Sequence, residues 1–351
     1  MPQRYWWNFA GGCLMMFLLA CSSNPEKTVD ELFAPYRGDD KPGAAVLVIS
    51  EGKPLLTRCY GMADIEKGIP VTPATNFRLA SVSKQFTAAA IQLLVEEDKL
   101  DYDTTLRQIF PDFPDYAKSI TIRNILQHTS GLIAYEDLIP DSATVPVKDR
   151  DVLEMMKTQD STYFTPGSAY RYSNTGYAVL AMVVEKLSGQ SFAEFLHDRI
   201  FQPLGMDSTV AFEKGISEVP QRAYGYAVHA DSIEFSDQSM TSSVLGDGGI
   251  YSSLNDLFRW DQALYSEKLL SAASRKLAVT PNLETYGFGW RIDEYRGHRR
   301  EHHTGSTCGF RTVIQRYPED HFTVIILTNR RDPDVANLAE RLTDIYLIGS
   351  K

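Results

Sequence analysis

The 351-residue sequence predicts an α/β (α+β) fold, in which a central antiparallel sheet is built from both chain ends with flanking helices and an inserted, mainly helical region. Strand-like apolar runs lie near the N-terminus, helical periodicity dominates the middle of the chain, and strand-like runs return near the C-terminus. We place the sheet part at residues 38–80 and 284–351 and the helical part at 81–283. A catalytic cleft is expected between the two parts.

The N-terminal strands and the helices have local signals. GAAVLVIS and PLLTRCYG flank an EGK turn at residues 51–53, which predicts a hairpin. SKQFTAAAIQLLVEEDKL and TGYAVLAMVVEKLSG predict helices. Gly189 can end one helix, and Ser191 with Glu194 forms a capping box for the next.

The C-terminal elements return to strands. YGFGWRI, GFRTVIQRY and FTVIILTN predict strands, with a PEDH turn between the last two. Asp332 and Pro333 are predicted to open a last helix whose apolar face covers the sheet.

Residues 1–20 have a charged start and a short apolar run, which predict an export signal. The run is too short to span a bilayer, which needs roughly 20 apolar residues. Its end, LLAC, resembles the bacterial lipobox, so we expect lipidation of Cys21, a tether over 21–37 and a domain over 38–351; an ordinary signal peptide is the alternative. Because Ser22 is not Asp, we expect a periplasm-facing lipoprotein of the bacterial cell envelope, anchored in the outer membrane.

Charge and cysteine content limit the possible functions. The chain has 35 Lys and Arg against 45 Asp and Glu, a net charge of -10, and no basic run, which excludes a nucleic-acid partner. Beyond the signal and Cys21, only Cys59 and Cys308 remain. Two thiols do not form a disulfide framework, and we treat both as packing residues, although they could pair in an oxidising compartment.

Ser-x-x-Lys occurs twice, at Ser50 to Lys53 and at Ser81 to Lys84. The first pair lies at a strand end and after a turn, where the side chains have no reason to meet. Ser81 instead precedes an apolar run with helical spacing, which places Lys84 one turn away on the same face. A lysine base at this position could activate the hydroxyl. The alternative is that Ser81 or Ser83 caps the helix and Lys84 is solvated.

Two further stretches carry candidate site residues. In YRYSNTGY, Tyr172 and Asn174 would face the same side of an extended loop; alternatively, Asn174 caps a helix and Tyr172 packs. In EHHTGSTCGF, His303-Thr304-Gly305 opens an apparent strand, where Gly305 would let a substrate approach the backbone and the Ser306 amide could face it.

No metal site is expected. His302 and His303 are adjacent and would project to opposite faces of a strand, and the chain contains no HExxH. His128, in LQHTSGL, is expected to be structural because nothing pairs it with a nucleophile.

Together, SVSK at 81–84, YSN at 172–174 and HTG at 303–305 resemble, in order and separation, the three motifs of the serine β-lactamase and penicillin-binding protein superfamily. The match is nearest to the class C β-lactamase and DD-peptidase branch. ITIRNILQHTSGL, FQPLGMDST and GDGGIYSSLNDL also resemble that family, so the resemblance covers nearly all of the mature chain. It implies a β-lactamase/transpeptidase-like fold.

The resemblance also implies roles for the motif residues. Ser81 would be acylated, with Lys84 and Tyr172 sharing the proton transfers; which of them is the base stays open. Asn174 would bind a substrate amide or steady Lys84, and the backbone amides of Ser81 and Ser306 would form the oxyanion hole.

The third motif departs from class C β-lactamases, which have lysine where this chain has His303. His303, Thr304 and Gly305 would bind the far side of the substrate. A histidine is mostly neutral at pH 7, which weakens attraction for a β-lactam carboxylate and favours peptidase or esterase action. We therefore expect activity to change between pH 5 and 8 as His303 titrates.

The predicted function is a serine hydrolase that forms a covalent acyl-enzyme with a small-molecule or peptide substrate, either a D-amino-acid peptide (DD-carboxypeptidase-like) or a small ester. A class C-like β-lactamase is one alternative, and a non-catalytic envelope lipoprotein that binds cell-wall peptide is another. An α/β-hydrolase is disfavoured because GQSFA lacks the second glycine of Gly-x-Ser-x-Gly. No cofactor is expected and no protein partner is identified. A lipid anchor would bind the membrane. The loop over residues 132–149 is expected to shape the substrate pocket.

Overall fold

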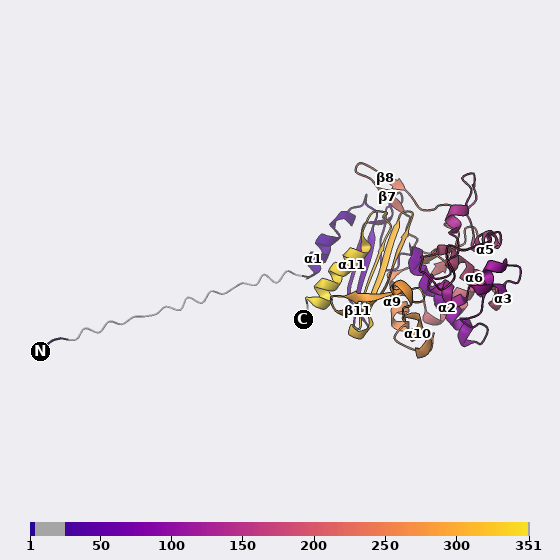
Figure 1. Ribbon diagram of the computed structural model, residues 1–351. Helices are drawn as coiled ribbons and strands as arrows, with labels where there is room; N and C mark the ends of the chain where they lie inside the picture. The colour runs from indigo at the N-terminus through magenta and orange to yellow at the C-terminus, as the bar shows by residue number, and fades with distance from the viewer. Residues whose placement is uncertain (4–24, 350–351) are drawn as a thin grey trace.

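The computed structural model describes residues 1–3 and 25–349. Its centre is a six-stranded antiparallel sheet in the order β10-β11-β12-β13-β1-β2 (Figure 1). Its strands are β1 Ala44–Ser50, β2 Lys53–Tyr60, β10 Arg291–Tyr295, β11 His298–Thr307, β12 Phe310–Tyr317 and β13 Phe322–Thr328. β1 and β13 come from opposite ends of the chain and pair in register, with Val46 opposite Ile326. The predicted fold class is therefore confirmed.

The β1–β2 hairpin forms around the predicted turn. Ser50 and Lys53 lie opposite each other in register, so they are closer than the sequence predicted. Lys53 is exposed, and no hydrogen bond joins the two side chains in the described part of the chain. This Ser-x-x-Lys match therefore belongs to a hairpin turn and does not bring the two side chains into hydrogen-bond contact.

Both faces of the sheet are covered, which explains why β1 is apolar at successive positions. Val46 and Val48 pack beneath α1 (Pro25–Leu32) and α11 (Val335–Thr343), which lie side by side on one face (Figure 1). Leu47 and the other alternate residues belong to the larger core on the opposite face.

The helical part lies on that opposite side (Figure 1). Its α-helices are α2 Lys84–Glu96, α3 Leu106–Ile109, α4 Ile122–Leu126, α5 Asp149–Lys157, α6 Asn174–Ser188, α7 Phe192–Leu196, α8 Gln202–Leu204, α9 Leu254–Ala263 and α10 Ala272–Ala278. Short 3-10 helices are η1 Ala34–Tyr36, η2 Ala80–Ser83, η3 Asp115–Ser119, η4 Tyr135–Leu138, η6 Leu283–Thr285 and η7 Pro318–Asp320. Single π-helical turns are η5 His197–Phe201 and η8 Asp344–Ile348.

Short strands outside the central sheet, some of them within the mainly helical part, were not predicted from the sequence. They are β3 Met62–Asp64 with β4 Ile69–Pro70, β5 Phe77–Arg78 with β9 Ile250–Ser252 and β6 Val210–Ala211, and β7 Tyr226–Val228 with β8 Ile233–Phe235. β3 with β4 and β7 with β8 are local pairs, whereas the sheet of β5, β9 and β6 joins residues that are distant in the sequence. For example, Arg78 lies opposite Tyr251, which ties the start of the site to the later GDGGIY stretch.

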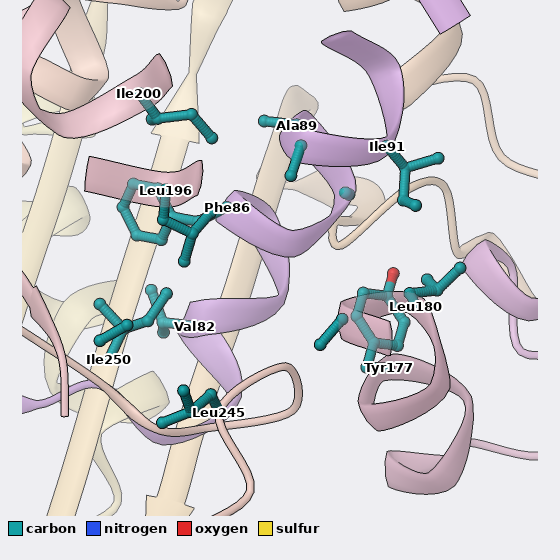
Figure 2. Close-up of a cluster of buried hydrophobic side chains, with 14 of the residues drawn as sticks. Val82, Phe86, Ala89, Ile91, Tyr177, Leu180, Leu196, Ile200, Leu245 and Ile250 are labelled. Carbon is teal, nitrogen blue, oxygen red and sulfur yellow. The ribbon is translucent and has the colours of Figure 1, made fainter. Parts of the chain in front are cut away.

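Helix α2 passes through the core. Phe86, Ala90 and Leu94, which have helical spacing, are all fully buried. Figure 2 shows Phe86 beside Leu196 and Ile200 in this cluster. The predicted boundary after α6 is also confirmed, because Gly189 adopts a left-handed conformation and Ser191 forms the capping box of α7.

Three predicted boundaries are wrong. Residues 25–37 are not a tether, because α1 and η1 fold onto the sheet, with Val29 and Phe33 fully buried. The last helix begins at Val335 and is capped by Asp334, since Asp332 instead pairs with Arg330.

The third wrong boundary concerns YGFGWRI, where β10 begins only at Arg291. Gly289 has a φ of +74°, and a Cβ there would lie 2.7 Å from the Lys84 carbonyl oxygen. The segment before β10 therefore turns against α2 and does not continue the strand.

Residues 4–20 of the predicted export signal, together with Cys21, lie outside the described residues. In the part of the chain that is described, no helix has the length and apolar character needed to cross a membrane. Cys59 and Cys308 are both free and partly buried.

Candidate active site

The backbone around Ser81 is held by contacts from distant elements. Ser81 lies in η2, which leads directly into α2. The preceding Ala80 has a φ of +49°, a left-handed conformation that costs about 1–2 kcal/mol for a residue with a Cβ. Thr312 Oγ1 donates to the Leu79 carbonyl at 2.7 Å. The strained turn before Ser81 is therefore fixed by β12.

Gly305 serves the same turn. His303, Thr304 and Gly305 do not open a strand, because the β11 ladder already begins at His298. A Cβ at Gly305 would lie 2.1 Å from the Leu79 carbonyl oxygen. The expectation that this glycine leaves space for substrate is corrected: the segment that precedes Ser81 fills the space.

Lys84 is fully buried and reaches three acceptors. Its Nζ donates to Ser81 Oγ at 3.2 Å, to Asn174 Oδ1 at 2.9 Å and to the Asp247 carbonyl oxygen at 2.7 Å. These contacts use all the donors that an ammonium has. Neither Ser81 nor Ser83 caps the helix through its side chain, so the capping alternative is wrong.

Asn174 is held in one orientation. Its Nδ2 donates to Glu136 Oε1 at 2.7 Å, which leaves Oδ1 to accept from Lys84. The helix cap of α6 is Ser173, whose Oγ accepts from the Gly176 amide. The alternative in which Asn174 caps this helix is therefore wrong.

Tyr172 enters the site from the loop before α6. Its ring centroid lies 5.0 Å from Lys84 Nζ and 4.2 Å from the centroid of the His128 ring. Its hydroxyl is buried and makes no hydrogen bond to any described residue. The phenol is thus beside the Ser81–Lys84 pair with its hydrogen-bonding capacity unused.

His128 packs directly on this tyrosine, which the sequence did not predict. Its Nδ1 accepts from the Ser173 amide at 3.1 Å, so in the neutral ring Nε2 carries the proton. Nε2 is buried and has no partner among the described residues. Burial, and then the positive charge of Lys84, hold the pKa of His128 well below 6.5.

His303 is buried, and both of its ring nitrogens are engaged. Nδ1 lies 2.7 Å from the Thr304 carbonyl oxygen, so Nδ1 carries the proton and Nε2 accepts from the Tyr286 hydroxyl at 3.0 Å. Burial, and then Lys84, hold the pKa of His303 well below 6.5. We predicted that activity would change between pH 5 and 8 as His303 gains a proton. The lowered pKa contradicts this prediction, because the His303 ring then stays neutral at these pH values.

A pocket of about 90 Å³ opens beside Ser81. The residues that line it are Arg78, Ala80, Ser81, Tyr135, Glu136, Asn174, Thr241, Asp247, Gly248, Ser306 and Thr307. Ser81 and Ser306, the two residues predicted to supply oxyanion-hole amides, therefore meet at one pocket. His303 and Thr304 are not among the described residues that line it.

Sequence reasoning missed the acidic wall of this pocket. Asp247 accepts from the Tyr135 hydroxyl at 3.1 Å, and burial raises the pKa of Asp247 to about 6. Tyr135 and Glu136 belong to the 132–149 loop that was expected to shape the pocket. Asp247 belongs to the GDGGIY stretch. Its contact with Lys84 is made by a backbone carbonyl, so the residue type at this position does not predict it.

The described residues contain no group of three or more His, Cys, Asp or Glu side chains that could hold a metal ion. The pocket presents the Ser81 hydroxyl and two carboxylates, and the buried Lys84 lies behind the serine. Tyr172 does not line the pocket among the described residues; its ring packs against Lys84.

The fold and the buried Ser–Lys pair define the class of serine hydrolases that work by acyl transfer. A model of the Beta-lactamase family matches residues 29–347. The chain therefore belongs to the β-lactamase family, as its three motifs predicted, and it is a serine hydrolase of that family.

Among its relatives, Penicillin-binding protein 4* of Bacillus subtilis is 34% identical over 331 residues, which cover 88% of this chain and 73% of that protein. D-aminopeptidase of Brucella anthropi is 29% identical over 330 residues, which cover 89% of this chain and 60% of that protein, so this chain spans less than two thirds of its length. The structure of a penicillin binding protein from Bacillus halodurans superimposes with a TM-score of 0.78 at 27% identity, covering 92% of this chain and 100% of that one.

Proposed function

We propose that this hydrolase cleaves amide or ester bonds of D-amino-acid substrates, with DD-carboxypeptidase-like peptides as the main class. Ser81 Oγ attacks the substrate carbonyl carbon and loses its proton to a base, while the leaving amine or alcohol gains a proton. Water then attacks the acyl ester, and Ser81 Oγ regains a proton. The observation that carries this proposal is the buried Lys84 Nζ, 3.2 Å from Ser81 Oγ.

The same contacts suggest how protons move. As a neutral amine, Lys84 can donate to the Asp247 carbonyl and Asn174 Oδ1, its two shorter contacts, and direct its lone pair at Ser81 Oγ. Tyr172, whose hydroxyl has no partner in the described chain, is then available to pass a proton to the leaving group. The backbone amides of Ser81 and Ser306, two residues that line the pocket, would stabilise the oxyanion.

Arg291 supports a substrate with a free carboxylate. Its guanidinium carbon lies 5.7 Å from the Tyr172 ring centroid and 5.5 Å from that of Tyr286. Arg291 is partly buried, forms no salt bridge with another described residue, and lies behind Tyr172 and not in the lining of the 90 Å³ pocket. This cation can bind the carboxylate that neutral His303 does not attract, which favours a peptide C-terminus as the substrate.

Glu136 supports a second candidate, cleavage of substrates that have a free amino group. Its carboxylate lines the pocket beside Asn174, and the carboxylate of Asp247 lies on the same wall. Two acidic groups favour an ammonium group on the substrate. The relative named D-aminopeptidase agrees with this alternative.

Two substrates and two variants separate these candidates. N-acetyl-D-alanyl-D-alanine has a free carboxylate and no amine, whereas D-alanine p-nitroanilide has a free amine and no carboxylate. Arg291→Gln should raise KM for the peptide alone by about 10- to 100-fold, the effect of one lost charged hydrogen bond. Glu136→Gln, which keeps an acceptor for Asn174, should leave that KM unchanged. Loss of p-nitroanilide cleavage in Glu136→Gln, with no effect of Arg291→Gln on either substrate, would favour the second candidate.

The acyl-enzyme itself is tested by intact-protein mass spectrometry of residues 25–351 after reaction with a fluorophosphonate or a labelled penicillin. One adduct is expected, and Ser81→Ala should abolish it. A long-lived penicillin adduct indicates a peptidase, and rapid release indicates a class C-like β-lactamase. No adduct with either probe would instead favour a protein that binds cell-wall peptide without turnover.

We further propose that the chain is a lipoprotein with an export signal over residues 1–20, lipidated at Cys21 and facing the periplasm from the outer membrane. The lipobox-like LLAC supports this proposal. The described helix α1 begins at Pro25 on the sheet face opposite the helical part, so an anchor there would leave the pocket side unobstructed. Metabolic labelling with a radioactive fatty acid should label the full chain and not Cys21→Ala.

A further inference from the structure

A buried carboxylate outside the pocket holds the loop that carries the Lys84 contact. Asp149 is the first residue of α5 and is only 7% exposed. Its Oδ2 accepts from the Leu245 amide at 2.8 Å, and its Oδ1 accepts from the Gly246 amide at 2.9 Å. Both carboxylate oxygens are therefore used on successive backbone amides.

The next residue of this loop delivers its carbonyl to Lys84. The Asp247 carbonyl oxygen is 2.7 Å from Nζ, the shortest of the three Lys84 contacts. The loop is held from α2 as well, because Thr87 Oγ1 donates to the Gly246 carbonyl at 2.7 Å. The loop also packs tightly, since a Cβ at Gly246 would lie 2.3 Å from the Tyr177 carbonyl oxygen.

Together, these contacts fix the backbone before Asp247 and so restrain the position of its carbonyl. If the two amides lost Asp149, the loop would keep the Thr87 bond but lose the restraint on the opposite side. Lys84 would then bond more strongly to its remaining acceptors or follow the displaced carbonyl. In either case, its distance from Ser81 Oγ would change.

We propose that Asp149 is a positioning residue for acyl transfer: it holds the Leu245 and Gly246 amides so that the Asp247 carbonyl orients Lys84 toward Ser81. The inference rests on the proposed acyl-transfer function. Asp149 touches neither substrate nor the reacting atoms, and it acts through the loop.

The first test compares Asp149→Asn with a matched control. Asparagine offers one acceptor and directs an NH₂ group at the second amide, so the rate of Ser81 adduct formation with a fluorophosphonate should fall about 10- to 100-fold, as expected for a catalytic group displaced by about 1 Å. Asp256→Asn removes a buried carboxylate that holds the Ser208 amide and hydroxyl. It should lower Tm but leave the acylation rate unchanged. Equal acylation rates in wild type and Asp149→Asn would overturn the proposal.

Thr87→Val keeps the test decisive if Asp149→Asn does not fold. It removes the bond to the Gly246 carbonyl and leaves that buried acceptor without this donor, while both Asp149 contacts remain, so a smaller fall in acylation rate is expected. A folded Thr87→Val with wild-type acylation rates would show that this loop does not position Lys84.

The pH profile separates positioning from stability. Burial raises the pKa of Asp149 to about 7. Protonation turns one acceptor into an O–H donor, so wild-type acylation should decline as the pH falls through 7. In Asp149→Asn this decline near pH 7 should be absent; Asp247, whose pKa burial raises to about 6, is unchanged in both proteins and would titrate alike in each. The other charged groups that line the cavity beside Asp149 are Lys148, Arg150, Glu185, Glu213 and Lys214.

Failure of the inference is distinguishable from failure of the proposed function. If wild type forms no adduct, acyl transfer itself is absent. Crystal structures of wild type and Asp149→Asn then decide the inference directly. The Lys84 Nζ to Ser81 Oγ distance, 3.2 Å in the wild type, should change in the variant together with the position of the Asp247 carbonyl, and an unchanged Lys84 to Ser81 contact would overturn the proposal.

Discussion

The Lys84 side of the site and the Tyr172 side differ in how many of their polar atoms are already bonded. Lys84 meets three acceptors, and one of them, Asn174, is itself fixed by Glu136. On the other side, the Tyr172 hydroxyl and His128 Nε2 are buried and have no partner among the described residues.

This difference indicates a division of work. Bonded polar groups give a fixed geometry, and each contributes about 1 kcal/mol to stability. Unbonded buried groups cost stability but keep a donor available for a substrate or a moving proton. We therefore expect the Lys84 side to hold the nucleophile before substrate arrives and the Tyr172 side to complete its hydrogen bonds during the reaction.

The largest effect should come from the bonded side. Lys84→Met keeps the length of the side chain but removes the amine, and loss of a general base typically lowers a rate by about 10²- to 10⁴-fold. Single-turnover acylation followed by mass spectrometry measures this fall. Lys99→Met, at a lysine whose side chain is 46% exposed, is the control and should acylate like wild type. Wild-type acylation by Lys84→Met would remove Lys84 from the mechanism.

The next prediction separates activity from stability across the two sides. Tyr172→Phe removes a hydroxyl that makes no bond to the described chain, so the free energy of unfolding should stay within about 0.5 kcal/mol while the rate falls about 100-fold. Urea denaturation and kcat measure the two effects.

Tyr177→Phe supplies the opposite case. Its hydroxyl donates to the Leu126 carbonyl at 2.9 Å, so the variant should lose about 1 kcal/mol of stability. It should also keep most of its activity. If Tyr172→Phe instead loses stability at full rate, the proposed difference between the two sides is wrong.

The parts of the site that the sequence predicts are those with local spacing. Ser81 and Lys84 are one helical turn apart, and a Tyr-x-Asn loop places Tyr172 and Asn174 on one side. The acceptors of Lys84 are not predictable in this way, because Asn174 lies 90 positions and Asp247 163 positions along the chain.

The same reasoning explains the fold. Continuous apolar runs in β1 and β13 identify a doubly covered sheet, so the pairing of the chain ends was predicted. The sequence predicts a tether where α1 lies because PEKTVDEL is mostly polar, and in the structure Val29 is the one buried residue of its eight. Its position depends on a sheet face that only the folded chain creates.

The smallest effect concerns the stability of the unbonded side. Burial holds the pKa of His128 well below 6.5, so below pH 6.5 the unfolded chain binds a proton that the folded chain does not. Stability should therefore fall with decreasing pH, by at most about 1.4 kcal/mol per pH unit for this group, until the folded-state pKa is reached. His303, whose pKa is lowered in the same way, adds a similar slope.

His128→Asn tests this contribution. Asparagine can accept from the Ser173 amide and tolerates the φ of +58° at this position, but it does not titrate. Urea denaturation between pH 5 and 7.5 should give a shallower acid decline in the variant than in wild type, with the His303 part retained. His197→Asn is the exposed control, with a side chain 62% accessible, and should leave the slope unchanged. An identical slope in His128→Asn would mean that His128 has the same pKa in the folded and unfolded chains, so burial would not hold its ring neutral beside Tyr172 at acidic pH.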